Sequence, residues 1–120
     1  MAFKIANIEI ENNVVLAPMA GFCDSAFRTL CKEHGAGLIY TEMVNNKGVV
    51  DRHWETMEML YMEDSEKPLG VQIFGTDLDS FVGATKYIAE NTDCDFLDIN
   101  MGCPMPKIAK KLQAGAALLK

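Results

Sequence analysis

The stretch LGVQIFG, residues 69–75, is an apolar run interrupted only by two glycines and one glutamine. Its residues do not alternate between apolar and polar, as those of a strand with one solvated face do. Strands that helices cover on both faces, the usual situation in a parallel sheet, show this nearly continuous pattern. The sequence therefore predicts a parallel β-strand over residues 69–75.

Three other runs of this kind occur along the chain, and each ends in residues that suit a loop. They are VVLAPM at 14–19, LIYTEM at 38–43 and FLDIN at 96–100. The four runs start roughly 25–30 residues apart, which is the length of a strand followed by a returning helix. The chain is therefore predicted to consist of repeated β/α units.

Helical patterns lie between the predicted strands. Asp24 and Asp77 are predicted N-caps, and Gly35 suits the end of the first helix. A loop is expected at 44–51, and a last helix begins at 114–119. The predicted apolar stripes are Ala26, Phe27, Leu30 and Cys31 in the first helix, Trp54, Met57, Leu60 and Tyr61 in a shorter one, and Phe81, Val82, Thr85, Ile88 and Ala89 in the helix after Asp77.

Alternating strands and helices fit either a doubly wound sheet or a closed barrel. The Gly-x-Gly-x-x-Gly fingerprint of a dinucleotide-binding fold does not follow the first strand. Each strand instead ends in chemically distinctive residues, as expected where active-site groups gather at the carboxyl ends of barrel strands. We predict an α/β fold, the N-terminal half of a TIM-type (β/α)8 barrel. Residues 3–11 alternate around Asn7 and predict a short hairpin that plugs one end of the barrel, or a solvated edge strand.

Composition limits the class of protein. The chain is 49% hydrophobic and 23% charged, as in one globular domain, and it has no run of about 18 apolar residues and no signal peptide. We expect a cytoplasmic protein without a membrane segment. Because four strands are half of the usual eight, we expect residues 1–120 to be a partial catalytic domain of a longer enzyme.

Cysteine usage and charge also exclude some classes of site. Four cysteines without a Cys-x-x-Cys pair, beside two histidines, favour neither a zinc site nor a disulfide framework, so we expect no metal. The formal net charge of −6 argues against a nucleic-acid-binding surface spread over this segment.

Two of the predicted strands, or the loops that follow them, carry residues suited to a flat ring. In the loop that follows the first strand, Pro18 removes a backbone donor, while Ala20 and Gly21 allow close approach to the main chain. An ordinary turn is the alternative. Gln72 lies inside an apolar run, and its paired donor and acceptor suit the edge of a heterocycle. A core glutamine with all its partners in the protein is the alternative there.

The stretch DINMGCP, residues 98–104, predicts the reaction site. Gly102 permits an unusual backbone conformation and Pro104 stiffens the exit, so that Cys103 is held outside the packed sheet. Asn100 faces the same side of its strand as Asp98 and could bind a ligand. The other three cysteines, Cys23, Cys31 and Cys94, are predicted to be structural.

Four motifs together resemble the tRNA-dihydrouridine synthase family over nearly all of the chain. They are APMAG at 17–21, TEM at 41–43, VQIFG at 71–75 and DINMGCP at 98–104. The resemblance implies FMN-dependent reduction of uridines in tRNA, with NADPH as the reductant.

The resemblance also implies roles for single residues. Pro18, Met19 and Ala20 would lie against the flavin, and Gln72 would hydrogen-bond its ring. Asn100 would position the flavin or the uracil. Cys103 would be the general acid, a role that suits a thiol because a free thiol is mostly protonated at neutral pH.

Because the chain carries a net negative charge, as tRNA does, it must be explained how the protein would bind tRNA. Lys107, Lys110 and Lys111 follow the cysteine turn and are candidates for phosphate contact, or else form a solvated helix face. The resemblance implies that a C-terminal helical domain, which lies outside this chain, supplies much of the grip on tRNA. One departure from the family is KKLQAG at 110–115, where many members have a turn richer in glycine.

Two other functions remain open from the sequence. One is an FMN-barrel oxidoreductase that acts on a free pyrimidine or an enone, which the Gly-Cys-Pro turn disfavours. The other is a non-catalytic tRNA-binding barrel, which the retention of Gln72, Asn100 and Cys103 disfavours.

Overall fold

The computed structural model describes all residues 1–120, and its centre is a twisted parallel sheet. The strands β3 (Val15–Leu16), β4 (Leu38–Tyr40), β6 (Leu69–Phe74) and β7 (Phe96–Ile99) lie side by side in chain order. The helices are α1 (Ser25–Glu33), α2 (Asn46–Val50), α3 (Trp54–Glu58) and α4 (Leu78–Asn91), with shorter helical turns η1 (Asp64–Glu66), η2 (Lys107–Lys111) and η3 (Gly115–Leu119). This order confirms the predicted first half of a TIM-type barrel.

The second predicted strand, 38–43, is interrupted by a bulge. Its continuation is β5 (Val44–Asn45), which pairs with β6 on the same edge as β4 does. Tyr40 pairs with Gly70 and Val44 with Ile73, so four steps along one strand oppose three along the other. One extra residue on one strand defines a β-bulge, which bends the strand and redirects side chains.

At this bulge a side chain supplies a hydrogen-bond acceptor for the backbone of β6. Thr41 is fully buried, its N–H donates to the Gly70 carbonyl at 3.0 Å, and its hydroxyl oxygen accepts the N–H of Gln72 at 3.1 Å. The hydroxyl thereby replaces the carbonyl that the bulge removed. The loop predicted at 44–51 was wrong, because Val44 resumes pairing with β6 and Asn45 then caps α2 by accepting the Gly48 N–H at 3.1 Å.

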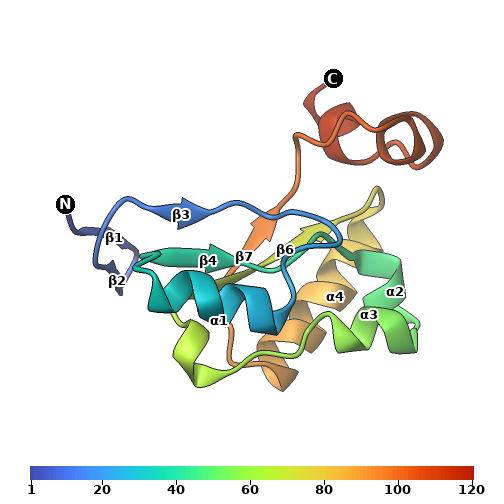
Figure 1. Cartoon of the computed structure of the whole chain (residues 1–120). Coiled ribbons are helices and arrows are strands. Elements are labelled where there is room, and N and C mark those ends of the chain that lie inside the picture. The colour runs from blue at the N-terminus through green and yellow to red at the C-terminus, as the bar shows by residue number, and fades with distance from the viewer.

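The two faces of the sheet have different neighbours. Helices α1 to α4 lie on one side of it in Figure 1, where Val71 and Ile73 pack with Ala84 and Ile88 of α4 in the larger core cluster. Since side chains alternate along a strand, Gln72 projects from the other face. That face is the one that lines the interior of a barrel.

The helix caps were predicted correctly, and the buried helix faces were predicted only in part. Asp24 and Asp77 accept the N–H groups of Phe27 and Ser80, and Gly35 has a φ of 96° just after α1. Several residues assigned to the apolar stripes are nevertheless exposed: Ala26, Leu30, Val82, Thr85 and Ala89. The buried positions are Arg28 in α1 and Ala84 and Ile88 in α4, of which Ile88 was predicted. The predicted Phe81 and Cys31 are partly buried and pack against the core clusters.

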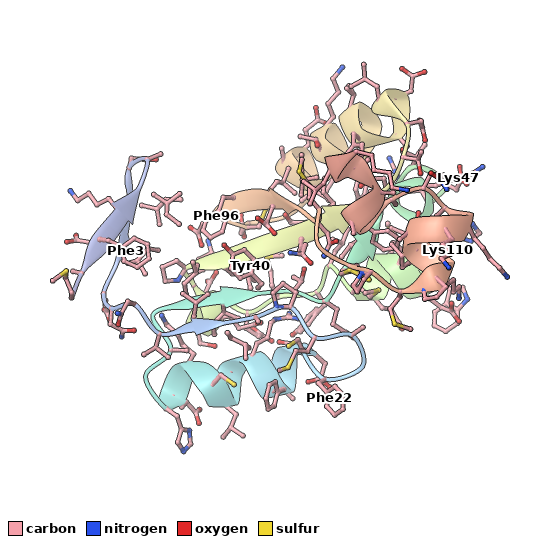
Figure 2. The ribbon with its side chains drawn as sticks, turned by 90° about the horizontal axis from the view of Figure 1, so that it is seen from above. Phe3, Phe22, Tyr40, Lys47, Phe96 and Lys110 are labelled. Carbon is pink, nitrogen blue, oxygen red and sulfur yellow. The ribbon has the colours of Figure 1, made fainter.

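The two ends of the chain lie at opposite ends of the sheet. The predicted hairpin is present as β1 (Phe3–Ile5) and β2 (Ile8–Ile10), and it lies beyond the amino ends of the strands (Figure 1). Figure 2 shows Phe3 at that end, and Phe22, Lys47 and Lys110 at the other. The predicted last helix is a 3-10 helix, η3. No helix has the length and apolar character needed to span a membrane.

Candidate active site

A chain of hydrogen bonds joins the carboxyl ends of β6 and β7. Gln72 and Asp98 are paired across the two strands, and the Gln72 Nε2 donates to the Asp98 carboxylate at 2.5 Å. The Gln72 Oε1 in turn accepts from the Nδ2 of Asn100 at 2.9 Å. Gln72 is only 8% exposed, so these bonds satisfy an amide that would otherwise be costly to bury.

Asn100 connects this chain to the cysteine turn. Its Oδ1 accepts the backbone N–H of Cys103 at 3.0 Å and that of Gly102 at 3.2 Å. Its own N–H donates to the carbonyl of Ile73, which extends the pairing of β7 with β6 by one residue. The partly exposed Cys103 is therefore held directly at the rim of the sheet.

The chain then returns to pack against this turn. The Ala116 N–H donates to the carbonyl of Cys103 at 3.1 Å. Gly115 has a φ of 58°, and a Cβ there would lie 2.8 Å from the same carbonyl oxygen. The hydroxyl of Thr76, in the loop after β6, donates to the carbonyl of Leu112. The path of residues 110–115 is thus fixed on both sides.

The loop after β3 lies at the same end of the sheet. β3 ends at Leu16, two residues before Pro18, which has no N–H to continue the pairing. Pro18 is partly buried, whereas Met19 and Ala20 are exposed. The N–H of Gly21 donates to the carboxylate of Glu42, which the bulge directs toward this loop.

A buried ion pair is hydrogen-bonded to the end of the same loop. The guanidinium of Arg28 pairs with Glu66, and both side chains are at most 3% exposed. Arg28 also donates to the carbonyl of Cys23 at 2.7 Å. Cys23 is fully buried, its Sγ lies 3.5 Å from the Ala17 carbonyl, and burial above all raises the pKa of its thiol. Its predicted structural role agrees with this position.

Two aromatic side chains lie on either side of Gly70, on the strands that flank β6. The rings of Tyr40 and Phe96 meet edge to face at 5.7 Å, across Gly70, and both are labelled in Figure 2. Burial and, after it, the negative charge of Asp98 raise the pKa of Tyr40.

The structure brings together three of the six predicted site residues. Gln72, Asn100 and Cys103 form one hydrogen-bonded group, whereas no hydrogen bond links that group to Pro18, Met19 or Ala20. A cavity of about 450 Å³ lies farther out, between α2 and the start of α4, and none of the six lines it.

Sequence reasoning missed two residues that organise this end of the sheet. They are Asp98, which Gln72 contacts, and Glu42, which holds the loop after β3. Aligning the parallel strands 69–75 and 96–100 by their apolar residues would have placed Asp98 opposite Gln72. No comparable signal identified Glu42, because its direction depends on the bulge.

Comparison with known proteins gives a consistent result. Probable tRNA-dihydrouridine synthases of Aquifex aeolicus and Mycobacterium tuberculosis are each 39% identical to this chain, over 90% and 98% of its length. The tRNA-dihydrouridine synthase B of Vibrio vulnificus is 38% identical over 98% of it. The chain spans about a third of the length of these relatives, 34%, 32% and 36% respectively.

The motifs that carry the hydrogen-bonded group all lie within the matched part of the chain. The sequence model of the dihydrouridine synthase family matches residues 15–120, from β3 to the last residue. The match includes all the parallel strands and every predicted site residue. The chain therefore belongs to the dihydrouridine synthase family.

Proposed function

We propose that the full-length protein reduces uridines in tRNA to 5,6-dihydrouridine, with FMN as its cofactor and NADPH as its reductant. In this proposal residues 1–120 are the first part of the FMN-binding barrel domain, and the enzyme acts in the cytoplasm on tRNA. Membership of the family and the names of the relatives support it. The observation that carries it is the group formed by Gln72, Asn100 and Cys103 at the carboxyl ends of β6 and β7.

The polar groups left unused in this site fit the edge of a flavin. Gln72 and Asn100 each use one amide hydrogen within the protein, which leaves one N–H on each, and Gln72 also keeps one oxygen lone pair. A ring edge with alternating carbonyl and N–H groups matches this set. Pro18, Met19 and Ala20 would contact the ring, since their loop combines apolar surface with a missing backbone donor.

The reaction divides between the cofactor and the protein. No amino-acid side chain can donate hydride, so bound reduced flavin would supply it to carbon 6 of the uracil. We assign the proton for carbon 5 to Cys103. Its S–H bond breaks as the C5–H bond forms, and the thiolate that remains recovers a proton from water.

Access to the base requires that the tRNA be opened and held. A stacked uridine cannot reach a ring inside a barrel, so it must be turned out of its stack. Lys107, Lys110 and Lys111 are exposed and follow the cysteine turn directly, which suits them to contact phosphates. Because the segment as a whole is acidic, other parts of the protein must supply most of the attraction for tRNA.

The decisive experiment uses the full-length protein. We expect it to purify with flavin absorbance and, with NADPH, to convert uridine to dihydrouridine in tRNA that lacks the modification, as measured by nucleoside mass spectrometry. Reduction of free uracil or of an enone at a higher kcat/KM than tRNA would replace the proposal with the rival oxidoreductase. Binding of tRNA without any conversion would favour a non-catalytic barrel.

A further inference from the structure

Asp98 has a contact that determines which way a neighbouring amide points. Its carboxylate accepts a hydrogen bond from the Nε2 of Gln72 at 2.5 Å. An ionised carboxylate can only accept hydrogen bonds, whereas an amide can turn over and present either its oxygen or its nitrogen. The nitrogen of Gln72 must therefore face Asp98, and its oxygen must face away.

The orientation of the Gln72 amide in turn fixes the orientation of the Asn100 amide. The oxygen of Gln72 accepts from the Nδ2 of Asn100 at 2.9 Å, so the nitrogen of Asn100 faces Gln72. The Oδ1 of Asn100 then faces the cysteine turn, where it accepts the N–H groups of Gly102 and Cys103. A reversed Asn100 would point its NH₂ at the N–H of Cys103, and two donors repel each other.

We infer that Asp98 is a positioning residue for the reaction: it fixes the direction of the Gln72 and Asn100 amides and thereby the position of the Cys103 turn. The inference rests on the proposed function for its link to catalysis.

A specific form of recognition follows from this arrangement. The oxygen of Asn100 is already occupied by two N–H groups, so Asn100 offers a ligand one N–H and no acceptor. It therefore suits a carbonyl oxygen of a heterocycle. Gln72 keeps one N–H and one lone pair, and can bind a ring edge that has both a donor and an acceptor.

The location of Asp98 allows its role in positioning the cysteine turn to be tested separately from a general contribution to the stability of the sheet. Asp98 is only partly buried, whereas Gln72 is 8% exposed and depends on it for a partner. At the opposite end of β7, Asp95 makes a comparable bond, accepting the N–H of Leu69 at 2.8 Å. Asp95 lies away from the cysteine turn and is a matched control for strand stability.

The test compares Asp98→Ala, Asp98→Asn and Asp95→Ala in the full-length protein. The first readout, in flavin-free protein, is the rate at which iodoacetamide alkylates Cys103, followed by peptide mass spectrometry with Cys31 and Cys94 as internal standards. We expect Asp98→Ala to raise the Cys103 rate about fivefold, because the loss of a fixed hydrogen-bond partner loosens the turn. The second readout is uridine reduction, where kcat should fall about 10-fold with the KM for tRNA within about twofold.

Asp98→Asn should rescue both readouts to within about threefold of wild type. The asparagine oxygen can still accept from Gln72, and the turn still favours the native direction of the amides. Asp95→Ala should leave the Cys103 alkylation rate and kcat unchanged. The inference is overturned if Asp98→Ala alters neither readout, or if Asp95→Ala alters them equally.

A second pair of variants decides the question if Asp98→Ala does not fold. Gln72→Glu sets two carboxylates against each other and should raise the alkylation rate of Cys103. Adding Asp98→Asn restores a donor opposite an acceptor-only group and should return the rate to near the wild-type value; no such return would overturn the inference. If wild-type protein fails to reduce uridine, the proposed function fails, while the alkylation rates still test Asp98.

Discussion

Replacing Gly115 with alanine should disturb the cysteine turn from outside the proposed site. Gly115 has a φ of 58°, and an added Cβ would lie 2.8 Å from the carbonyl oxygen of Cys103 and 3.1 Å from its Cβ. Ordinary contact begins at 3.4 Å, so the Cys103 carbonyl must move by about 0.6 Å or the return segment must withdraw by the same amount. Either movement weakens the 3.1 Å bond that the Ala116 N–H donates to Cys103.

Two separate costs add up in this variant. A left-handed backbone costs an L-residue about 1–2 kcal/mol, and forcing a methyl group into a packed site costs about 1–3 kcal/mol. We therefore expect Gly115→Ala to lose about 2–5 kcal/mol of stability. Since a displacement of about 1 Å can lower a rate by about 10²-fold, one of 0.6 Å should lower kcat about 10-fold.

Two controls separate backbone strain from displacement of the turn. Gly35→Ala introduces a left-handed alanine at φ 96° with no atom within 4 Å, so it should lose only about 1–2 kcal/mol and keep its kcat. Gly102 has no positive φ, so the unusual backbone conformation expected at this position is absent. Gly102→Ala, beside Cys103, also meets nothing within 4 Å, and its stability should be unchanged. Thermal unfolding and uridine reduction by the full-length variants give both quantities. Equal stability losses in Gly115→Ala and Gly35→Ala, with normal kcat in both, would refute the reasoning.

Two further predictions concern stability. Arg28→Met leaves Glu66 buried without its cation, so the free energy of unfolding should fall by about 3–5 kcal/mol. The double variant Arg28→Met/Glu66→Met should recover most of this loss, as measured by thermal unfolding. A double variant as unstable as the single one would contradict this. The N–H of Ser80 donates a hydrogen bond to the Asp77 carboxylate and lowers the pKa of Asp77 below its unfolded value. The cap therefore contributes its full stabilisation of α4 above about pH 4, and this contribution is lost as the pH falls through the folded pKa. The stability difference between wild type and Asp77→Ser, which keeps a cap that does not titrate, should therefore change only in acid, and a constant difference from pH 7 to pH 2 would contradict the assignment.

The strands and caps could be predicted because they depend on local sequence. The run 69–74 is buried throughout, as its continuous apolar pattern requires, and Asp24 and Asp77 cap helices as their side-chain chemistry predicts. The predicted site residues Gln72, Asn100 and Cys103 fall in one hydrogen-bonded group because parallel strands end at the same edge.

The features that were missed depend on contacts distant in the sequence. The face of α1 turns inward at Arg28 because Glu66, 38 residues later, neutralises it, and apolar periodicity cannot register such a pair. The bulge before Val44 depends on Thr41 bonding to Gln72 across the sheet, so 44–51 was read as a loop. The role of Asp98 emerges only when β6 and β7 are aligned.

The central claim, that Cys103 supplies the proton as the base accepts hydride, is tested most directly by single-turnover kinetics. The flavin of full-length Cys103→Ala is reduced with NADPH and mixed with unmodified tRNA, and its reoxidation is followed by absorbance, with Cys31→Ala as the control. We expect the variant to retain its flavin and to be reoxidised about 10²–10⁴-fold more slowly than wild type, while the control keeps the wild-type rate. Reoxidation of Cys103→Ala at the wild-type rate, with dihydrouridine formed, would remove Cys103 from its role.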